Sequence, residues 1–421
     1  MKLKAPDITV FEHQSLRLGE GKDKLSKDHL DALQKFYGEK GVPYYSLIHN
    51  GVKFNEHVGV IQIGKTQIEI LPKADKTQDQ SEQAKRNWQT VLIDMLKTVD
   101  LFKVHAPSSS NLSLKSKSVL DLYFELFIQE IEYLIHRGLI KKYRKIEGNR
   151  MALKGSLQFP KHVRLNAIHQ ERFYVNYSTY DTQHDLHAIL FKAIKLLSRI
   201  NTNAQLSSRL GVLLLHFPEQ AEIRITESIF DKIRLNRKTE PYKKALEIAK
   251  LILLNYHPDL SQGRNHVLAL MFDMNLLWEK FVYASIRKFG DAYLTVSAQN
   301  KRGFWKPKTG QSSSIRPDIV INRGKENCIV LDTKWKNLDG SNPSVDDLRQ
   351  MFVYNSYFGS QKVALVYPGT VSYYKPGNFY KIQDDRSNLL EKSECGIFSI
   401  AVNMDVRNWQ IEISNWIKSN L

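Results

Sequence analysis

The chain has 421 residues, of which 61 are Lys or Arg and 44 are Asp or Glu, so its formal net charge is +17. With 42% hydrophobic residues it can bury cores, which excludes a wholly disordered protein. Two cysteines, Cys328 and Cys395, exclude a disulfide framework and a four-ligand zinc site. The basic excess favours a polyanionic partner, although an ordinary solvated surface gives the same count.

The sequence predicts a cytoplasmic protein of roughly two to three domains. Its N-terminal stretch, MKLKAPDITVFEHQ, has no apolar core typical of a signal peptide. The most apolar helix candidate, residues 119–135, carries four acidic residues, so no membrane span is expected.

Residues 1–80 are predicted to form a β-rich domain. The run 58–71 alternates apolar and polar residues around Gly64 and Lys65, which is typical of a β-hairpin. The polar stretch 74–85 is expected to be a linker or loop. The same hairpin contains the letters of a phosphate-binding loop, G-x-x-x-x-G-K-T, from Gly59 to Thr66. Because a strand pattern and Pro72 follow Lys65, where such a loop requires a helix, we expect no nucleotide-binding site here.

Residues 81–265 are predicted to be mainly helical, with a loop at 108–118. Helical spacing occurs in four segments, 87–98, 119–137, 186–200 and 241–255, and Gly138 is a plausible stop for the second. Another helix is predicted over 268–289, in a last domain spanning residues 266–421.

The basic excess is densest at residues 137–172, which contain ten basic and two acidic residues with interleaved aromatics. Such a composition suits phosphate contacts and base stacking in a double-stranded DNA complex, whereas the alternative is a solvated turn between a helix and a hairpin. The candidate DNA-binding residues are Lys141, Lys142, Arg144, Lys145, Arg150 and Lys154.

The segment 315–336 carries the strongest chemical pattern. Two apolar strands, 319–321 and 328–335, flank a turn, and a turn centred on residue 325 places Asp318 opposite Asp332. Lys334 lies two residues after Asp332 and therefore on the same face. Two close carboxylates repel each other unless a cation lies between them, and Asp oxygens suit Mg²⁺. We therefore expect Asp318 and Asp332 to bind Mg²⁺ and Lys334 to assist phosphodiester hydrolysis; the alternative is an incidental surface Asp-x-Lys.

Two neighbouring helices are expected to support this site. Glu279 is one acidic residue on an apolar helix face, and it is either a third metal ligand or a solvated charge paired with Lys280. Gln350 and Tyr354 are four residues apart on the next helix and share a face, so they either approach the lysine or DNA, or pack ordinarily. The order helix, hairpin, helix, strand is the core of one nuclease architecture.

At Asp318, Asp332 and Lys334 the chain resembles the PD-(D/E)xK nucleases. More closely, it resembles the McrC family, the nuclease subunits of McrBC modification-dependent restriction systems. The resemblance rests on ordered blocks over most of the chain; one departure is His187, where Asn is expected. The blocks are VGVIQIGKTQIEILPK, RGLIKKYRKIEGNRMALKGSL, RFYVNYSTYDTQHDLHAILFKAI, LLWEKFV, RPDIVI, LDTKWK and DDLRQMFVYNSY.

The resemblance implies an α+β, multidomain protein whose last domain is a restriction-endonuclease-like α/β domain. It implies a Mg²⁺-dependent endonuclease subunit that binds a McrB-like AAA+ GTPase hexamer through its N-terminal part and stimulates GTP hydrolysis. The GTP then belongs to the partner, which also recognises modified cytosine. Exposed N-terminal residues such as Lys53, Asn55 or Lys65 are candidates for stimulating the partner. The alternative is a non-catalytic DNA-binding or adaptor subunit of an AAA+ complex.

Overall fold

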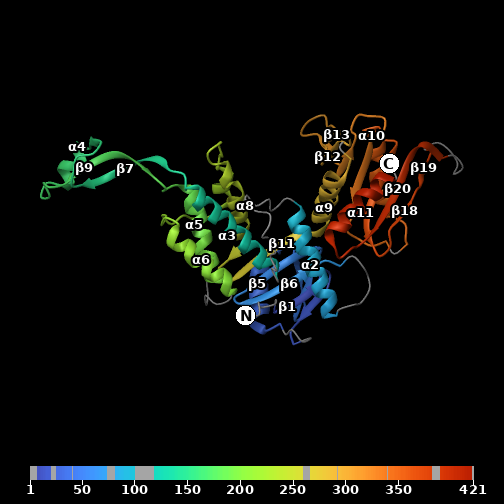
Figure 1. Ribbon diagram of the computed structural model, residues 1–421, viewed down its shortest axis with the longest axis horizontal. Coiled ribbons are helices and arrows are strands. Elements are labelled where there is room, and N and C mark those ends of the chain that lie inside the picture. Colours follow the sequence, from blue (N-terminus) through green and yellow to red (C-terminus); the bar gives the residue numbers. More distant parts are fainter. Residues whose placement is uncertain are drawn as a thin grey trace. The chain divides into compact units, whose positions relative to one another are not determined.

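The computed structural model describes residues 7–19, 25–39, 41–73, 81–99, 118–258, 266–291, 293–338, 340–381 and 389–419 (Figure 1). They belong to two compact units. We call the described residues 118–257 the arm-bearing unit, and the described residues within 5–103 and 258–421 the two-sheet unit. Part of the expected linker, residues 74–80, and most of the expected loop, residues 108–117, lie outside the described residues.

Four longer helices form the core of the arm-bearing unit, namely α3 (Val119–Arg137), α5 (Asp185–Ile200), α6 (Ala204–His216) and α8 (Lys243–Leu254). The expected helices in this region are confirmed. Ser118 caps α3 by accepting a hydrogen bond from the Asp121 N–H, and the helix ends at Gly138, whose φ of 89° suits glycine. Shorter elements complete the unit: α7 (Glu227–Asp231), η1 (Glu240–Tyr242) and β10 (Tyr256–His257).

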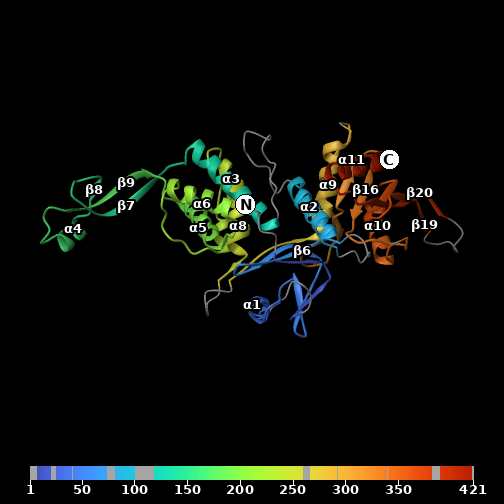
Figure 2. The ribbon, with the colours of Figure 1, turned by 60° about the horizontal axis from the view of Figure 1, so that its bottom comes forward.

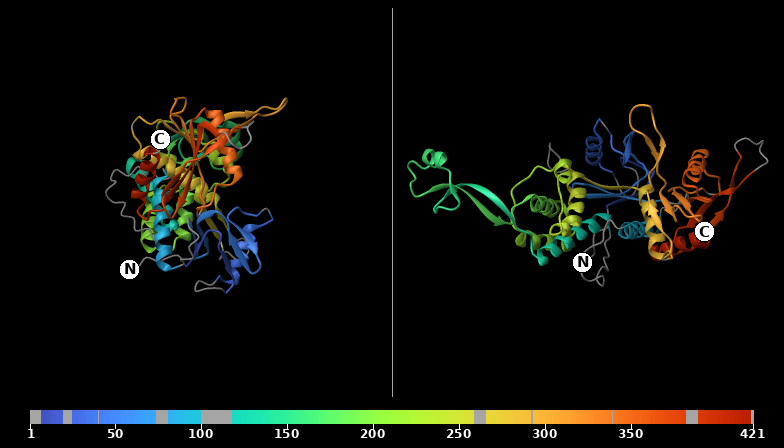
Figure 3. Two further views of the ribbon diagram at one scale, coloured as in Figure 1. Left: turned by 90° about the vertical axis from the view of Figure 1, so that its right-hand side faces the viewer. Right: turned by 90° about the horizontal axis from the view of Figure 1, so that it is seen from above.

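The arm of this unit is a long antiparallel pair inserted between α3 and α5. Strand β7 (Lys142–Arg150) pairs with β9 (Phe173–Asp181), and β8 (Ser156–Leu157) and α4 (Phe159–Leu165) lie at the far end. Figure 3 shows the arm, in green, extending away from the helices of its own unit. Most side chains of β7 are exposed, so the arm buries little apolar surface.

The first sheet of the two-sheet unit has the order β1 (Ile8–Phe11), β6 (Thr66–Leu71), β5 (His57–Ile63) and β11 (Val267–Asp273). Strands β5 and β6 form the predicted hairpin, with Gly64 at a φ of 57° in its two-residue turn. Lys65 therefore precedes a strand, and the strand–helix context of a phosphate-binding loop does not exist here.

The prediction of one helix over residues 268–289 is wrong in its first part. Residues 267–273 form strand β11, which pairs antiparallel with β5, and α9 (Met274–Phe289) begins only after the cap Asp273. In a short apolar run, periodicity cannot distinguish a buried strand from a helix. Here the segment is a strand because it pairs with the open edge of β5. Gly59 permits the pairing, because a Cβ at this position would lie 2.1 Å from the carbonyl oxygen of Leu270.

Both faces of the first sheet are covered (Figure 2). On one face lie α1 (Lys27–Tyr37) and a small sheet of β2 (Ser15–Arg17), β4 (Gly51–Phe54) and β3 (Tyr45–Ile48), which share one apolar core with it. On the other face, α2 (Glu82–Thr98) contacts β6, and Gln89 donates a hydrogen bond to the buried Glu69. Since α2 also contacts α9, the units do not follow the expected ranges 1–80, 81–265 and 266–421.

The second sheet has the order β12 (Val296–Ala298), β15 (Ile319–Ile321), β16 (Ile329–Thr333), β17 (Lys362–Gly369), β20 (Leu389–Ala401) and β18 (Tyr373–Lys375). Strand β19 (Asn378–Tyr380) pairs with β20, and β13 (Arg302–Trp305) pairs with β14 (Ser313–Ile315) in a separate hairpin. Helix α10 (Val345–Phe358) packs on this sheet, as do α9 and α11 (Val406–Ser419). The predicted order helix, hairpin, helix, strand is confirmed as α9, β15–β16, α10 and β17.

Two further sequence expectations concern the whole chain. Cys328 and Cys395 are both buried and free. Among the residues that the structure describes, no helix combines the length and apolar character needed to cross a membrane.

Candidate functional site

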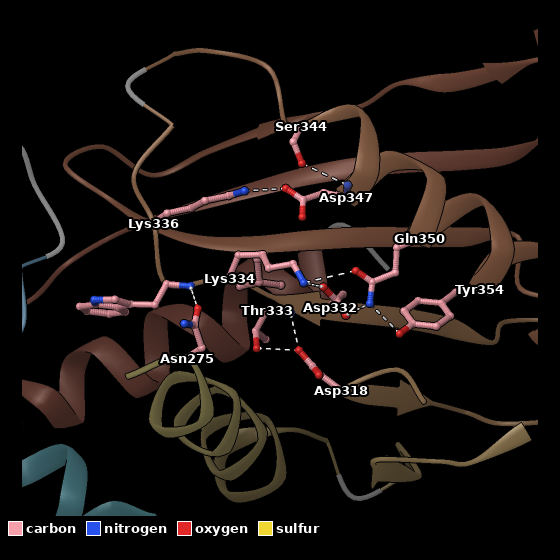
Figure 4. Close-up of polar contacts among 12 residues, drawn as sticks. Asn275, Asp318, Asp332, Thr333, Lys334, Lys336, Ser344, Asp347, Gln350 and Tyr354 are labelled. Carbon is pink, nitrogen blue, oxygen red and sulfur yellow. Dashed lines mark hydrogen bonds and ion pairs between the residues drawn. The ribbon is translucent and has the colours of Figure 1, made fainter. Parts of the chain in front are cut away.

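The β15–β16 hairpin brings together the residues that the sequence pattern selected. Ile319 pairs with Leu331 and Ile321 with Ile329, so the predicted turn centre at residue 325 is confirmed. Asp318 immediately precedes β15, and Asp332 and Lys334 lie on β16 and directly after it. Figure 4 shows the three side chains converging beside helix α10.

Asp318 is held by the strand opposite it. Its Oδ2 accepts hydrogen bonds from the backbone N–H and the hydroxyl of Thr333, at 2.7 and 2.9 Å. Thr333 was not among the predicted site residues. In the sequence, only its position between Asp332 and Lys334 points to a role at the site. Strand alternation predicts that the Thr333 side chain lies on the face opposite to those two residues.

Asp332 is almost completely buried, with 1% of its surface exposed. Burial raises its pKa to about 7, the nearby Asp318 adds to this, and Lys334 offsets part of it. Its Oδ2 lies 2.8 Å from Lys334 Nζ in an ion pair, and its Oδ1 accepts a hydrogen bond of 3.3 Å from Gln350. The carboxylate therefore sits in an environment that favours a compensating positive charge.

Lys334 supplies part of that charge. Burial opposes its charged form, but the surrounding carboxylates of Asp332, Asp318 and Asp347 outweigh burial and raise its pKa. Its Nζ also donates to Gln350 Oε1 at 3.3 Å. The lysine is therefore protonated at neutral pH, and its ammonium group is held between a carboxylate and an amide.

Gln350 and Tyr354 both reach the site from α10. The Gln350 amide contacts Lys334 through its oxygen, and Asp332 and Tyr354 through its nitrogen, the last at 2.7 Å. Tyr354 in turn donates to the carbonyl oxygen of Arg316 at 3.2 Å. These contacts link α10 to strand β16 and to the segment that leads into β15.

Glu279 lies on α9 at the border of the site. It is 9% exposed, and burial followed by the charge of Asp318 raises its pKa. Gln299, at a φ of 52°, donates its side-chain amide to Glu279 at 2.8 Å and its backbone N–H to the Asp318 carbonyl oxygen at 2.9 Å. Gln299 was not predicted from sequence, because its place depends on this uncommon backbone conformation.

The residue after Lys334 ties the site to the first sheet. The Trp335 ring nitrogen donates to Glu12 Oε1 at 2.8 Å, and its backbone N–H donates to Asn275 at 3.1 Å. The same Glu12 oxygen accepts the Lys73 N–H at 2.7 Å. Glu12 is 2% exposed, and burial raises its pKa to about 7 against the effect of these two donors.

We expect Glu12→Gln to flatten the pH dependence of stability. The pKa of Glu12 is about 7 in the folded state and 4.5 in the unfolded state. Below pH 4.5 the carboxyl is protonated in both states and does not lower the free energy of unfolding. As pH rises from 4.5 to 7, only the unfolded state releases the proton, and the free energy of unfolding falls by up to about 3 kcal/mol. Urea unfolding at pH 5 and pH 8 measures the difference. An equal pH effect in Glu12→Gln and wild type contradicts this expectation, and the exposed Glu82→Gln is the control.

The predicted DNA-binding residues lie on or beside the arm. Arg144 pairs with Asp181 at 3.0 Å, and Arg150 donates to the hydroxyl of Tyr177 and lies over its ring. Apolar side chains are prominent at the far end of the arm. The exposed ones there are Met151, Leu153, Leu157, Phe159, Val163, Leu165 and Ile168. Exposed apolar side chains suit protein contacts, and they lie here among exposed basic residues such as Lys154 and Arg164.

The remaining sequence candidates are scattered. In the first half of the two-sheet unit, Lys53 and Lys65 are exposed and Asn55 donates to the Pro43 carbonyl oxygen at 3.0 Å. His187 lies in the core of the arm-bearing unit, 3.0 Å from the Tyr242 hydroxyl, and burial lowers its pKa to about 4. It is therefore a neutral core histidine.

Comparison with known proteins identifies the relatives of this architecture. The family model described as "McrBC 5-methylcytosine restriction system component" matches residues 52–368. The chain is similar to one in the half-complex from a tetradecameric assembly of Thermococcus gammatolerans McrB AAA+ hexamers with bound McrC. The TM-score is 0.65 and the identity 20%, with 98% of this chain and 100% of that chain covered. This likeness shows a shared fold.

A second structure, of the Thermococcus gammatolerans McrBC complex, has a TM-score of 0.46 and 19% identity, covering 68% of this chain and 88% of that one. No curated protein matches the chain.

Proposed function

Since the chain belongs to the McrBC 5-methylcytosine restriction system component family, we propose that it is the DNA endonuclease subunit of a GTP-dependent restriction complex directed at modified cytosine. Its second sheet is then a PD-(D/E)xK nuclease domain. The observation that supports the proposal best is that the β15–β16 hairpin brings Asp318 near Asp332, with Lys334 2.8 Å from Asp332.

The carboxylates suit Mg²⁺, which we propose as the cofactor. Asp332 Oδ2 is buried and accepts no well-aligned hydrogen bond, and among the described residues none donates to Asp318 Oδ1. In the described ranges no group of three or more His, Cys, Asp or Glu side chains has the geometry of a metal site. We therefore assign the cation to Asp318 and Asp332, and Glu279 lies beside them without being a third ligand. When bound, Mg²⁺ supplies Lewis-acid stabilisation of the phosphate and an acidified water.

The protein groups have separate roles in this proposal. Asp318 and Asp332 hold the cation, and the Thr333 donors orient Asp318. Lys334 keeps a positive charge beside the position of the phosphate, where negative charge grows during hydrolysis. Gln350 positions the Lys334 ammonium group through its amide oxygen, while Tyr354 positions Gln350.

We further propose a McrB-like AAA+ GTPase hexamer as partner, with GTP bound to that partner. Support comes from the family and from the similar chain that occurs with McrB AAA+ hexamers. The apolar far end of the arm is suited to such a protein contact. The alternative function, a non-catalytic adaptor, predicts complex formation and DNA binding without cleavage.

The experiment is cleavage of a duplex that carries modified cytosine by the chain together with its AAA+ partner and GTP. We expect cleavage with Mg²⁺, none with EDTA, and none with Asp318→Ala, while size-exclusion chromatography shows that this variant still joins the complex. Equal cleavage by Asp318→Ala and wild type would overturn the assignment of the site, and complex formation and DNA binding without any cleavage by the wild type would leave the adaptor as the better account.

A further inference from the structure

The β13–β14 hairpin projects from the second sheet (Figure 3). Arg302 pairs with Ile315 and Trp305 with Ser313, and nearly every side chain between residues 301 and 314 is exposed. A two-stranded hairpin of this kind is marginally stable by itself in water. Its second strand leads through Arg316 and Pro317 directly into Asp318.

The hairpin and its flanks carry charge of one sign only. Residues 292–317 contain five basic side chains and no acidic one. The basic residues are Lys301, Arg302, Lys306, Lys308 and Arg316. Among the described residues the three lysines form no ion pair, so their charge is available to an external anion.

Aromatic contacts hold the hairpin against α10, and one aromatic ring of the hairpin, that of Trp305, remains exposed. The Phe304 ring lies 5.3 Å from that of Tyr357, and Arg302 lies over the Phe358 ring at 5.9 Å. Trp305 is 60% exposed and has no ring partner in the described part of the chain. An exposed indole with lysines on either side of it in the sequence is a suitable stacking surface for a base.

A surface cavity of about 370 Å³ joins the hairpin to the candidate site. Phe304 and Arg316 line it on the hairpin side, and Gln350 and Tyr354 line it on the α10 side. Gln350 is the residue that contacts both Lys334 and Asp332. A nucleic-acid strand bound along the hairpin would therefore lie against Gln350 and Tyr354, the two α10 residues that reach the candidate site.

We propose that residues 301–316 form the DNA-binding element that holds the strand next to the cleaved phosphodiester, with the lysines on phosphates and Trp305 stacked on a base. The choice of DNA rests on the proposed function. Protein-binding surfaces are depleted in lysine, whereas lysines are the usual partners of backbone phosphates, which favours a nucleic acid here.

Binding without cleavage tests this proposal. Anisotropy of a labelled DNA duplex is measured in EDTA at several salt concentrations, for the full-length chain and for the triple variant Lys301→Ala, Lys306→Ala, Lys308→Ala. We expect at least a tenfold weaker affinity, and a slope of log affinity against log salt that falls by about 3 if each lysine contacts one phosphate. The matched control removes three exposed lysines of the same unit that have no part in the proposed sites: Lys27→Ala, Lys288→Ala, Lys381→Ala.

Trp305 is tested in the same assay. Trp305→Ala is expected to weaken binding about tenfold, the effect of one lost base stack, and Trp305→Phe to restore most of it. Wild-type affinity of Trp305→Ala would overturn the stacking contact. Since the side chain is exposed, unfolding temperatures of all these variants should match wild type.

The outcomes separate this proposal from the nuclease proposal. An unchanged affinity and salt slope in the triple lysine variant overturns the hairpin assignment, even if the carboxylates prove catalytic. A loss of affinity equal to that of the control variant, or a loss of partner binding with unchanged DNA affinity, also overturns it. Weaker DNA binding in the triple variant combined with full cleavage by Asp318→Ala supports the hairpin and overturns only the nuclease site.

Discussion

Asp332→Asn is expected to reduce DNA cleavage by roughly a thousandfold or more, because it removes one of two charged ligands from the proposed cation site. Asparagine keeps the size of the side chain and can still bond with Gln350. Assembly with the AAA+ partner should therefore be unchanged. In EDTA, DNA binding should be equal or tighter, since a carboxylate that repels phosphate has been lost.

The matched control is Asp346→Asn on α10. Asp346 has the same charge, but its side chain is 89% exposed and pairs with Arg349, outside the site. It should cleave at the wild-type rate. Full cleavage by Asp332→Asn, or equal losses in the two variants, would show that the buried carboxylate has no specific part in the reaction.

Lys334→Ala is expected to lower the cleavage rate by roughly a thousandfold, with little change in DNA affinity. The ammonium group is held by Asp332 and Gln350 where charge develops during hydrolysis, so its loss affects the transition state more than the bound substrate. Lys334→Arg should recover only part of the rate, because a planar guanidinium does not reproduce a compact point charge.

Lys336→Ala provides the comparison for Lys334→Ala. Lys336 follows two residues later and pairs with Asp347 at 2.6 Å, so it carries the same charge without contacting Asp332. Single-turnover cleavage and anisotropy in EDTA together separate chemistry from binding. If Lys334→Ala weakened DNA binding and left the single-turnover rate unchanged, the lysine would be a phosphate anchor and not a participant in catalysis.

Local patterns in the sequence were sufficient to predict the β15–β16 hairpin. Two apolar runs on both sides of a Gly-containing turn predict a hairpin, and a turn centred on residue 325 placed Asp318 opposite Asp332 before any tertiary contact was considered. Helical spacing likewise predicted that Gln350 and Tyr354 share a face. These features depend on neighbours within about twenty residues, which a single sequence displays directly.

Local sequence patterns did not predict strand β11 or the division of the chain into its two units. The apolar pattern of residues 267–273 fits a helix as well as a strand. They form a strand because they pair with the open edge of β5, which lies some two hundred residues earlier in the chain. Helix α2 groups with α9 because both pack between the sheets, although the chain places them far apart. Such choices depend on which surfaces remain unpaired after folding.

The sequence by itself determined the carboxylate pair, the lysine, the basic excess and the unsuitability of the Gly59–Thr66 segment for nucleotide, because each follows from residue type and short-range periodicity. Only the tertiary structure decided that Thr333 and Gln299 hold Asp318, that Trp335 bonds to Glu12, and that a basic hairpin adjoins the site. The physical reason is that hydrogen bonds and burial across distant segments depend on packing in three dimensions, and no local period encodes them.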